Sequence, residues 1–136
     1  MRLSNMADYA VLTMSAAARH CGGARVAAAQ LAEETGLPVP TVQKLVSRLT
    51  AAGLLRSARG VGGGLKLARP AAAITLADIV EAVEGPIGLA PCADESHGDC
   101  AHETGCVARP HWATVSAAVR GALADVPLTR LAETAR

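Results

Sequence analysis

The order of local signals between residues 27 and 69 constrains the fold more than any other feature of this sequence. A short helical segment at 27–35 ends at Gly36, the turn LPVP follows, and a second helical segment begins near Pro40. Glycine suits the left-handed conformation that ends a helix, and proline suits a first turn, where its missing N–H would be unpaired anyway. LLRSAR and LKLAR then predict two strands joined by RGVGGG. Helix, tight turn, helix and hairpin is the order of a winged helix-turn-helix.

The second of these helices, TVQKLVSRLTAAG, has one apolar and one polar face. The apolar positions recur at helical spacing and are Val42, Leu45, Val46, Leu49 and Ala52. The polar and cationic positions point away from them and are Thr41, Gln43, Lys44, Ser47 and Arg48. A helix is narrow enough for the DNA major groove, where Gln43 can pair with adenine and Lys44 or Arg48 with guanine or phosphate.

Positive charge is concentrated in this part of the chain. Six lysines and arginines and no acid lie between Thr41 and Arg69. The glycines at 60 and 62–64 let the hairpin turn approach a sugar–phosphate backbone, with Arg59 at the base of the turn and Lys66 on the second strand. Exposed cations can also serve only to solvate a surface. The absence of acids, the helix order and the glycine turn together indicate DNA binding.

The remaining segments are mainly helical. Apolar residues repeat at helical spacing after Ser4, and ITLADIVEAVEG begins with a capping box formed by Thr75 and Asp78. A last long helix starts near Arg109. It carries one apolar stripe, which consists of Trp112, Val115, Val119, Leu123 and Val126. This stripe is larger than a lone terminal helix can cover, so we expect a partner subunit to bury it.

The predicted class is therefore mostly α, with a winged helix-turn-helix domain and a long C-terminal dimerisation helix. We assign the DNA-binding domain to residues 1–85, a loop to 86–108, and the dimerisation helix with a C-terminal tail to 109–136. A chain of 136 residues is the size of one compact unit. No apolar run approaches the roughly 18 residues of a membrane span, and MRLSNMADYA lacks the apolar core of a signal peptide. We expect a cytoplasmic protein that does not associate with membranes.

The segment CADESHGDCAHETGC, from Cys92 to Cys106, contains three cysteines and two histidines without apolar periodicity. In a reducing compartment, clustered cysteines are more often metal ligands or redox sensors than structural disulfides. Gaps of seven and five residues separate Cys92, Cys100 and Cys106. These gaps differ from the CxxC pairs of zinc ribbons, although His97 and His102 could complete a zinc site. An iron–sulfur cluster needs about four ligands and tolerates wider spacing.

Two other uses of these cysteines stay open at this point. A DNA-binding regulator could be switched by zinc or by thiol–disulfide chemistry instead of a cluster. A cysteine-dependent enzyme would need a helix N-terminus or an oxyanion site beside the thiol to activate it, and the polar loop offers neither. We therefore expect that the chain is not an enzyme.

Four motifs resemble the Rrf-type winged-helix iron–sulfur transcriptional regulators, and together they cover nearly the whole chain. They are MRLSNMADYAV, GLPVPTVQKLVSRLTAAGLLRSARGVGGGLKLARP, ITLADIVEAVEG and the three cysteines before a terminal helix. VARPHW after Cys106 and DY near the start look most like the subgroup that controls the SUF operon. The resemblance implies a homodimeric repressor or activator that binds a palindromic operator. It also implies sensing of iron, redox or cluster-assembly status and control of iron–sulfur cluster biogenesis genes.

The resemblance also assigns site residues. It makes Cys92, Cys100 and Cys106 the ligands of a [2Fe-2S] or [4Fe-4S] cluster. Among the DNA-facing residues, it places Gln43, Lys44 and Arg59 where family members contact DNA.

The fourth cluster ligand stays open among Asp8, His102 and His111, because Arg109 stands where the family's assembly regulator has a histidine. Asp8 matches an aspartate that a related sensor supplies from the opposite subunit, but an acid in a first turn also stabilises the helix dipole. Either histidine can instead be an ordinary solvent-exposed residue. Cys21 is expected to be a small, half-buried residue and not a ligand.

Overall fold

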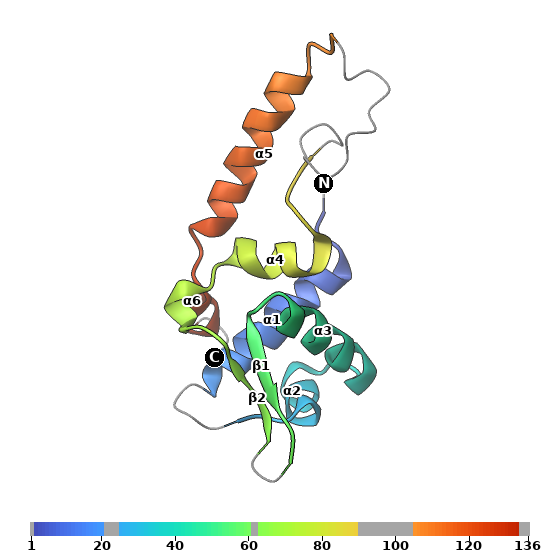
Figure 1. Cartoon of the computed structure of the whole chain (residues 1–136), viewed down its shortest axis with the longest axis vertical. Coiled ribbons are helices and arrows are strands. Elements are labelled where there is room, and N and C mark those ends of the chain that lie inside the picture. Colours follow the sequence, from blue (N-terminus) through green and yellow to red (C-terminus); the bar gives the residue numbers. More distant parts are fainter. Residues whose placement is uncertain (1, 21–24, 61–62, 90–104, 134–136) are drawn as a thin grey trace.

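The computed structural model describes residues 2–20, 25–60, 63–89 and 105–133. The described elements are α1 (Asn5–Arg19), α2 (Ala28–Thr35), α3 (Val39–Ala51), β1 (Leu55–Ala58), β2 (Gly64–Leu67), the 3-10 helix η1 (Ala71–Ala73), α4 (Leu76–Glu84), α5 (Arg109–Ala124) and α6 (Leu128–Glu133). Apart from α5, they form one head, and α5 projects from it (Figure 1). The mostly helical class is confirmed. Among the described helices, none has both the length and the hydropathy that a membrane crossing needs.

Helix α1 is the central element of the head. It begins where the Ser4 hydroxyl accepts a hydrogen bond from the Ala7 amide at 3.1 Å, an N-cap that satisfies one of the otherwise unpaired first-turn donors. Its inward face consists mainly of alanines around Met14, which is fully buried. Because alanine has a small side chain, α2, α3, α4, α6 and β2 can all pack directly against this helix.

The helix-turn-helix forms as its turn residues predict. Gly36 ends α2 with a left-handed φ of 74°, and Pro40 lies in the first turn of α3. Val42, Leu45 and Leu49 are completely buried, so the apolar face of α3 is the one that the sequence pattern gives.

The hairpin follows directly. Strands β1 and β2 are antiparallel, with Leu55 opposite Leu67 and Ser57 opposite Leu65. The segment before α2 also joins this sheet, because Val26 and Leu65 exchange backbone hydrogen bonds of 2.9 and 2.8 Å. At the turn, a Cβ on Gly63 would lie 2.5 Å from the Ala58 carbonyl oxygen, so only glycine fits there.

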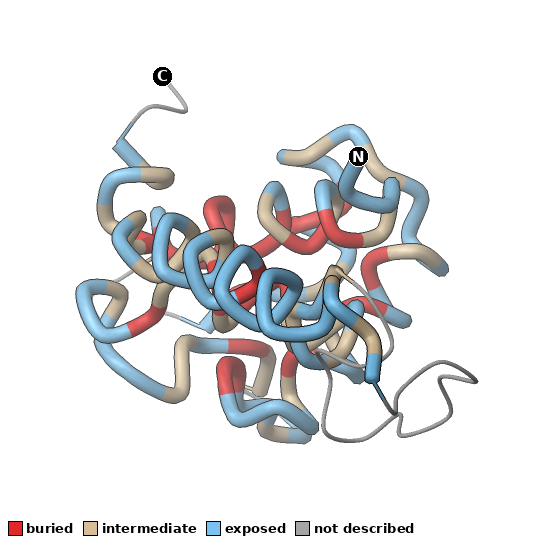
Figure 2. Tube along the Cα trace, turned by 90° about the horizontal axis from the view of Figure 1, so that it is seen from above, coloured by how far each residue is buried: buried red, intermediate tan, exposed pale blue. Residues whose placement is uncertain are grey.

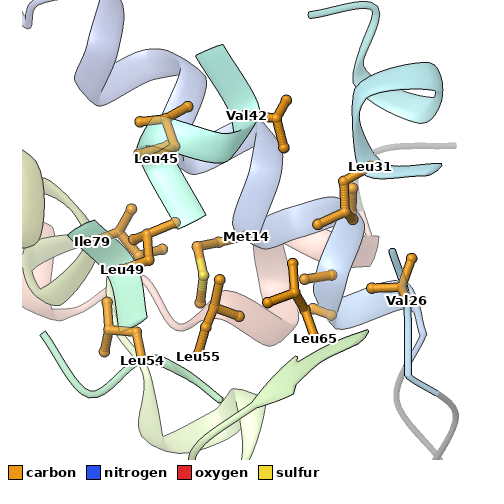
Figure 3. Packing of buried hydrophobic residues seen from close by; sticks show 14 of the residues in the cluster. Met14, Val26, Leu31, Val42, Leu45, Leu49, Leu54, Leu55, Leu65 and Ile79 are labelled. Carbon is orange, nitrogen blue, oxygen red and sulfur yellow. The ribbon is translucent and has the colours of Figure 1, made fainter. Parts of the chain in front are cut away.

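One aliphatic core joins these elements. Leucines from α2, α3 and the hairpin surround Met14, and Ile79 of α4 closes one side (Figure 3). The sequence has no phenylalanine and only one tryptophan and one tyrosine. The core therefore depends on many medium-sized side chains and on close helix approach instead of a few large aromatic ones.

Helix α4 begins with the predicted capping box. The Thr75 hydroxyl accepts from the Asp78 amide at 3.2 Å, and the Asp78 carboxylate accepts from the Thr75 amide at 2.9 Å. The helix ends before Gly85, whose φ is 84°.

The C-terminal region differs from the sequence prediction in one respect. The long helix ends at Ala124, so Val126 does not continue its apolar stripe. Pro127 explains the break, because proline disfavours helical geometry at the preceding residue and cannot donate a backbone hydrogen bond. The chain instead pairs with the start of α4: the Leu76 amide donates to Val126 at 2.9 Å, and the Leu128 amide donates to Ile74 at 2.8 Å.

Helix α6, which the sequence analysis missed, follows this pairing and packs against α1 and η1. Its residue Leu128 is fully buried in the head core.

We predict that Leu128→Ala destabilises the protein by about 2–5 kcal/mol, because it leaves a cavity in a closed core. Urea unfolding at a fixed protein concentration measures this loss. Leu12→Ala is the matched control, since it removes the same atoms from a side chain that is 43% exposed. Equal losses for the two variants would contradict the docking of α6 into the core.

Candidate DNA-binding surface and cysteine segment

The polar face of α3 lies on the surface of the head. Gln43, Lys44, Ser47 and Arg48 are exposed, and Thr41 is half-buried at the edge of the face. The Ser47 hydroxyl donates to the Gln43 carbonyl at 3.1 Å, within the helix. The side chains of Gln43 and Lys44 have no hydrogen-bond or ion-pair partner among the described residues, so they are available to a ligand.

Two arginines of the basic region are engaged elsewhere in the head. Nη1 of Arg48 donates to the Val83 carbonyl of α4 at 3.4 Å. Nη2 of Arg69 lies 3.5 Å from the Asp78 carboxylate, also on α4. The absence of acids between residues 41 and 69 therefore does not leave every cation without a partner.

The hairpin adds positive charge beside α3. Arg59 is exposed at the end of β1, next to Gly60, which has a φ of 90°. Lys66 is exposed on β2 directly opposite Arg56. Like charges directly opposite each other destabilise a strand pair, so an anion on this face would relieve the repulsion.

The sequence analysis missed Arg25. This exposed residue lies beside the base of the hairpin, with its Cβ 3.2 Å from the position that a Cβ on Gly64 would take. Its placement depends on the pairing of Val26 with Leu65, for which the sequence carries no local signal.

The basic elements and the arm lie at opposite ends of the molecule. In Figure 1, α2, α3 and the tip of the hairpin are near the bottom, and α5 extends toward the top. Whatever links the cysteine segment to a DNA-binding surface must therefore act through the head.

Most of the predicted cluster ligands lie outside the described residues: Cys92, Cys100 and His102. Cys106 is described as a half-exposed free thiol just before α5. Asp8 is exposed in the first turn of α1, and His111 is exposed in the first turn of α5. Among the described residues, no three metal-binding side chains come together.

The donor chemistry fits an iron–sulfur cluster. Such clusters are held by thiolates, and the segment supplies three cysteines within 15 residues. Cys106 is neither in a disulfide nor fully buried, so its sulfur is available as a ligand. One protomer supplies three thiols from this segment, and the fourth donor must come from another type of residue or another chain.

The described residues on both sides of the cysteine segment are connected to α5. The Leu89 amide donates to Ser116 Oγ at 3.0 Å, and Ser116 is the one buried residue of this helix. Cys106 lies three positions before Arg109, where α5 begins. The rest of α5 is mainly exposed, including Trp112 at 41% and Val115 at 43% (Figure 2).

A hollow of about 330 Å³ separates α5 from the head near Leu89. It is lined by the chain before α1, the end of α4, residues 86–89, and Val119 and Leu123 of α5. The arm therefore meets the head through few direct contacts.

Comparisons with known proteins agree with this architecture. The chain matches the Rrf2 family, described as an iron-dependent transcriptional regulator, over residues 3–134. It is 30% identical over 131 residues to the HTH-type transcriptional regulator IscR of Vibrio vulnificus (strain YJ016), covering 96% of this chain and 77% of that protein. For IscR of Photobacterium profundum, the identity is 32% over 133 residues, covering 96% and 75%.

Solved structures give the same result. The structure is similar to CymR, the global cysteine regulator of B. subtilis, with a TM-score of 0.78, 28% identity and 98% coverage of both chains. Its TM-score with T. potens IscR is 0.75 at 27% identity, over 100% of this chain and 89% of the other. The winged-helix fold and the family resemblance are thus confirmed, and these relatives are regulators, not enzymes. The chain belongs to the Rrf2 family of helix-turn-helix transcriptional regulators.

Proposed function

We propose that the protein is a homodimeric transcription regulator that senses an iron–sulfur cluster and binds a palindromic operator of cluster biogenesis genes. The observation that carries this proposal is the position of the three-cysteine segment, between α4 and α5 of an Rrf2-family chain. The description of the family as iron-dependent supports iron as the metal, and the similarity to T. potens IscR is consistent with it.

The DNA contacts come from α3 and the hairpin. Gln43 and Lys44 occupy the centre of the exposed face and reach base edges in the major groove. Thr41, Ser47 and Arg48 contact the sugar–phosphate backbone around them. Arg59 and Lys66 bring the hairpin to the adjacent backbone or minor groove.

The cluster is held by the thiolates of Cys92, Cys100 and Cys106. When bound, an iron–sulfur cluster supplies a centre whose assembly depends on iron and whose integrity depends on redox conditions. Asp8 of the partner subunit is the proposed fourth ligand, with His102 and His111 as the other candidates. A carboxylate is a weaker iron ligand than a thiolate, which suits a centre that must be lost when conditions change.

Dimerisation uses the exposed apolar side of α5, which includes Trp112 and Val115. A two-fold axis gives each protomer the same contact and makes the operator palindromic. Half-sites on DNA lie about 34 Å apart, so a small change in the spacing of the two α3 helices alters affinity.

A thiol switch is the second candidate, because the solved relatives include an oxidized form of Staphylococcus aureus CymR, with a TM-score of 0.71 and 30% identity. In that case the three cysteines would cycle between thiols and a disulfide, with zinc as a further possible occupant. Iron and sulfide content separates these possibilities.

We predict that protein prepared without oxygen contains iron and acid-labile sulfide, and that Cys100→Ser loses both because a thiolate ligand is removed. Metal and sulfide analysis with visible absorption measures this. Cys21→Ala is the control and should retain the cluster. Stoichiometric zinc without sulfide, or a reversible disulfide without iron, would transfer the regulator to the second candidate.

We predict that Lys66→Ala lowers the slope of log affinity against log salt concentration by about 0.9, because one phosphate contact is lost. Arg2→Gln removes an exposed cation near α4 and α5 and should leave the slope unchanged. Gln43→Ala should instead reduce discrimination between operator and unrelated DNA by about 1–3 kcal/mol. Titrations at several salt concentrations test these outcomes, and equal slopes for Lys66→Ala and Arg2→Gln would exclude the hairpin contact.

The fourth ligand can be assigned by complementation between subunits. We predict that Asp8→Ala and Cys100→Ser homodimers each lack a stable cluster, because each damages both sites. A mixed dimer, purified through two affinity tags, should recover one cluster, since one intact cysteine segment then faces an intact Asp8 of the other chain. His111→Ala is the control and should retain two clusters. No recovery in the mixed dimer would exclude Asp8 of the partner subunit as a ligand.

A further inference from the structure

Helix α4 contacts every element that matters to the proposed switch. It packs against α1, α3 and α5. It also carries three acids at intervals of three residues, and each contacts a different part of the chain. Asp78 faces Arg69 after the hairpin at 3.5 Å, Glu81 accepts from Arg120 of α5 at 2.6 Å, and Glu84 accepts from the Ser4 hydroxyl.

The C-terminal end of α4 explains the fourth contact. The last carbonyls of a helix lack internal partners and carry partial negative charge, which a nearby cation stabilises. Helix α4 has no basic residue in its own last turn. Arg48 of α3 supplies the cation, since its guanidinium donates to the Val83 carbonyl at 3.4 Å. The helix that faces DNA is thus connected to the end of α4 nearest the cysteine segment.

The contacts form a continuous route from the arm to the DNA-binding elements. Residues on both sides of the cysteine segment are joined to α5, through the Leu89–Ser116 hydrogen bond and through the chain at Cys106. Arg120 lies one helical turn beyond Ser116 and binds Glu81. From α4, Arg48 leads to α3, and Asp78 leads to the end of the hairpin.

We propose that α4 is the coupling element of this regulator, and that Glu81, Arg120 and Arg48 are positioning residues that transmit the orientation of α5 to α3. This inference rests on the proposed cluster-dependent function and adds the route of transmission. Arg48 acts through α3 in this scheme, and its contact with α4 decides how Gln43 and Lys44 are presented. A shift of the arm then changes the fit of both α3 helices to the operator.

The exposure of these pairs makes the proposal testable. Arg120 and Glu81 are 51% and 26% exposed, and exposed ion pairs contribute little to stability. Replacing one partner should therefore leave the head folded, and thermal unfolding of each variant checks this. A role in coupling would change the response to the cluster, which a purely structural role would not.

The first experiment measures operator affinity of the wild type and Glu81→Gln, each with and without the cluster. Allosteric factors are typically about 5- to 150-fold, and we expect the wild-type factor to fall at least threefold in the variant. Glu33→Gln, which neutralises an exposed acid on α2, should keep the wild-type factor. The charge-swapped double variant Glu81→Arg, Arg120→Glu should restore it.

The outcomes separate the two proposals. If the wild type binds its operator equally with and without the cluster, the proposed function fails. If the wild type responds and Glu81→Gln responds to the same extent, only the coupling role of α4 is overturned. A lost factor that the charge swap does not restore overturns the Glu81–Arg120 step.

The second experiment uses protein without a cluster. Arg48→Ala should weaken operator binding and leave the salt slope unchanged, because a positioning residue releases no counterions. A slope reduced by about 0.9 would instead make Arg48 a phosphate contact and remove it from the route. Because coupling is reciprocal, adding operator should also change the fluorescence of Trp112, the only tryptophan. This change should shrink in Glu81→Gln, and an unchanged signal would contradict the coupling.

Discussion

The burial of one face of α3 determines how the protein meets DNA. Val42, Leu45 and Leu49 are fully buried against the α1 and hairpin core. A helix advances by about 100° per residue, so a rotation by one position would expose leucine and bury Lys44. Both changes are unfavourable, since they place apolar surface in water and a charge in an apolar core. The DNA-facing direction of Gln43 and Lys44 is therefore a consequence of core packing.

The same core sets the position of the hairpin. Leu55 and Leu65 are buried on the inner face of the sheet, which leaves Arg56 and Lys66 on the outer face. Since α3 and the hairpin share the residues around Met14, they cannot move independently without opening the core. A regulator built in this way changes its fit to an operator by moving whole heads more easily than by rearranging one head.

Local signals predicted most of the head. Gly36 and the Thr75–Asp78 capping box act within a few residues, so the sequence alone identifies where α2 ends and α4 begins. The docking of α6 was not predictable in this way, because it requires Val126 and Leu128 to pair with a segment about 50 residues earlier. The position of Arg25 and the contacts of Arg48 with α4 depend on tertiary packing in the same manner. The candidate DNA surface was thus predictable by residue type, whereas the connections behind it were not.

The weak attachment of α5 gives a physical reason for the position of the cysteine segment. Within its own chain, α5 buries only Ser116 and adds the exposed Arg120–Glu81 pair. Few contacts mean that a small difference in free energy can change the orientation of the arm, whereas the aliphatic head would resist it. Ligand binding at the base of the arm can bias such an equilibrium only by interacting differently with its two states. Residues on both sides of the cysteine segment are joined to α5, so a ligand held there acts on the part of the molecule that costs least to move.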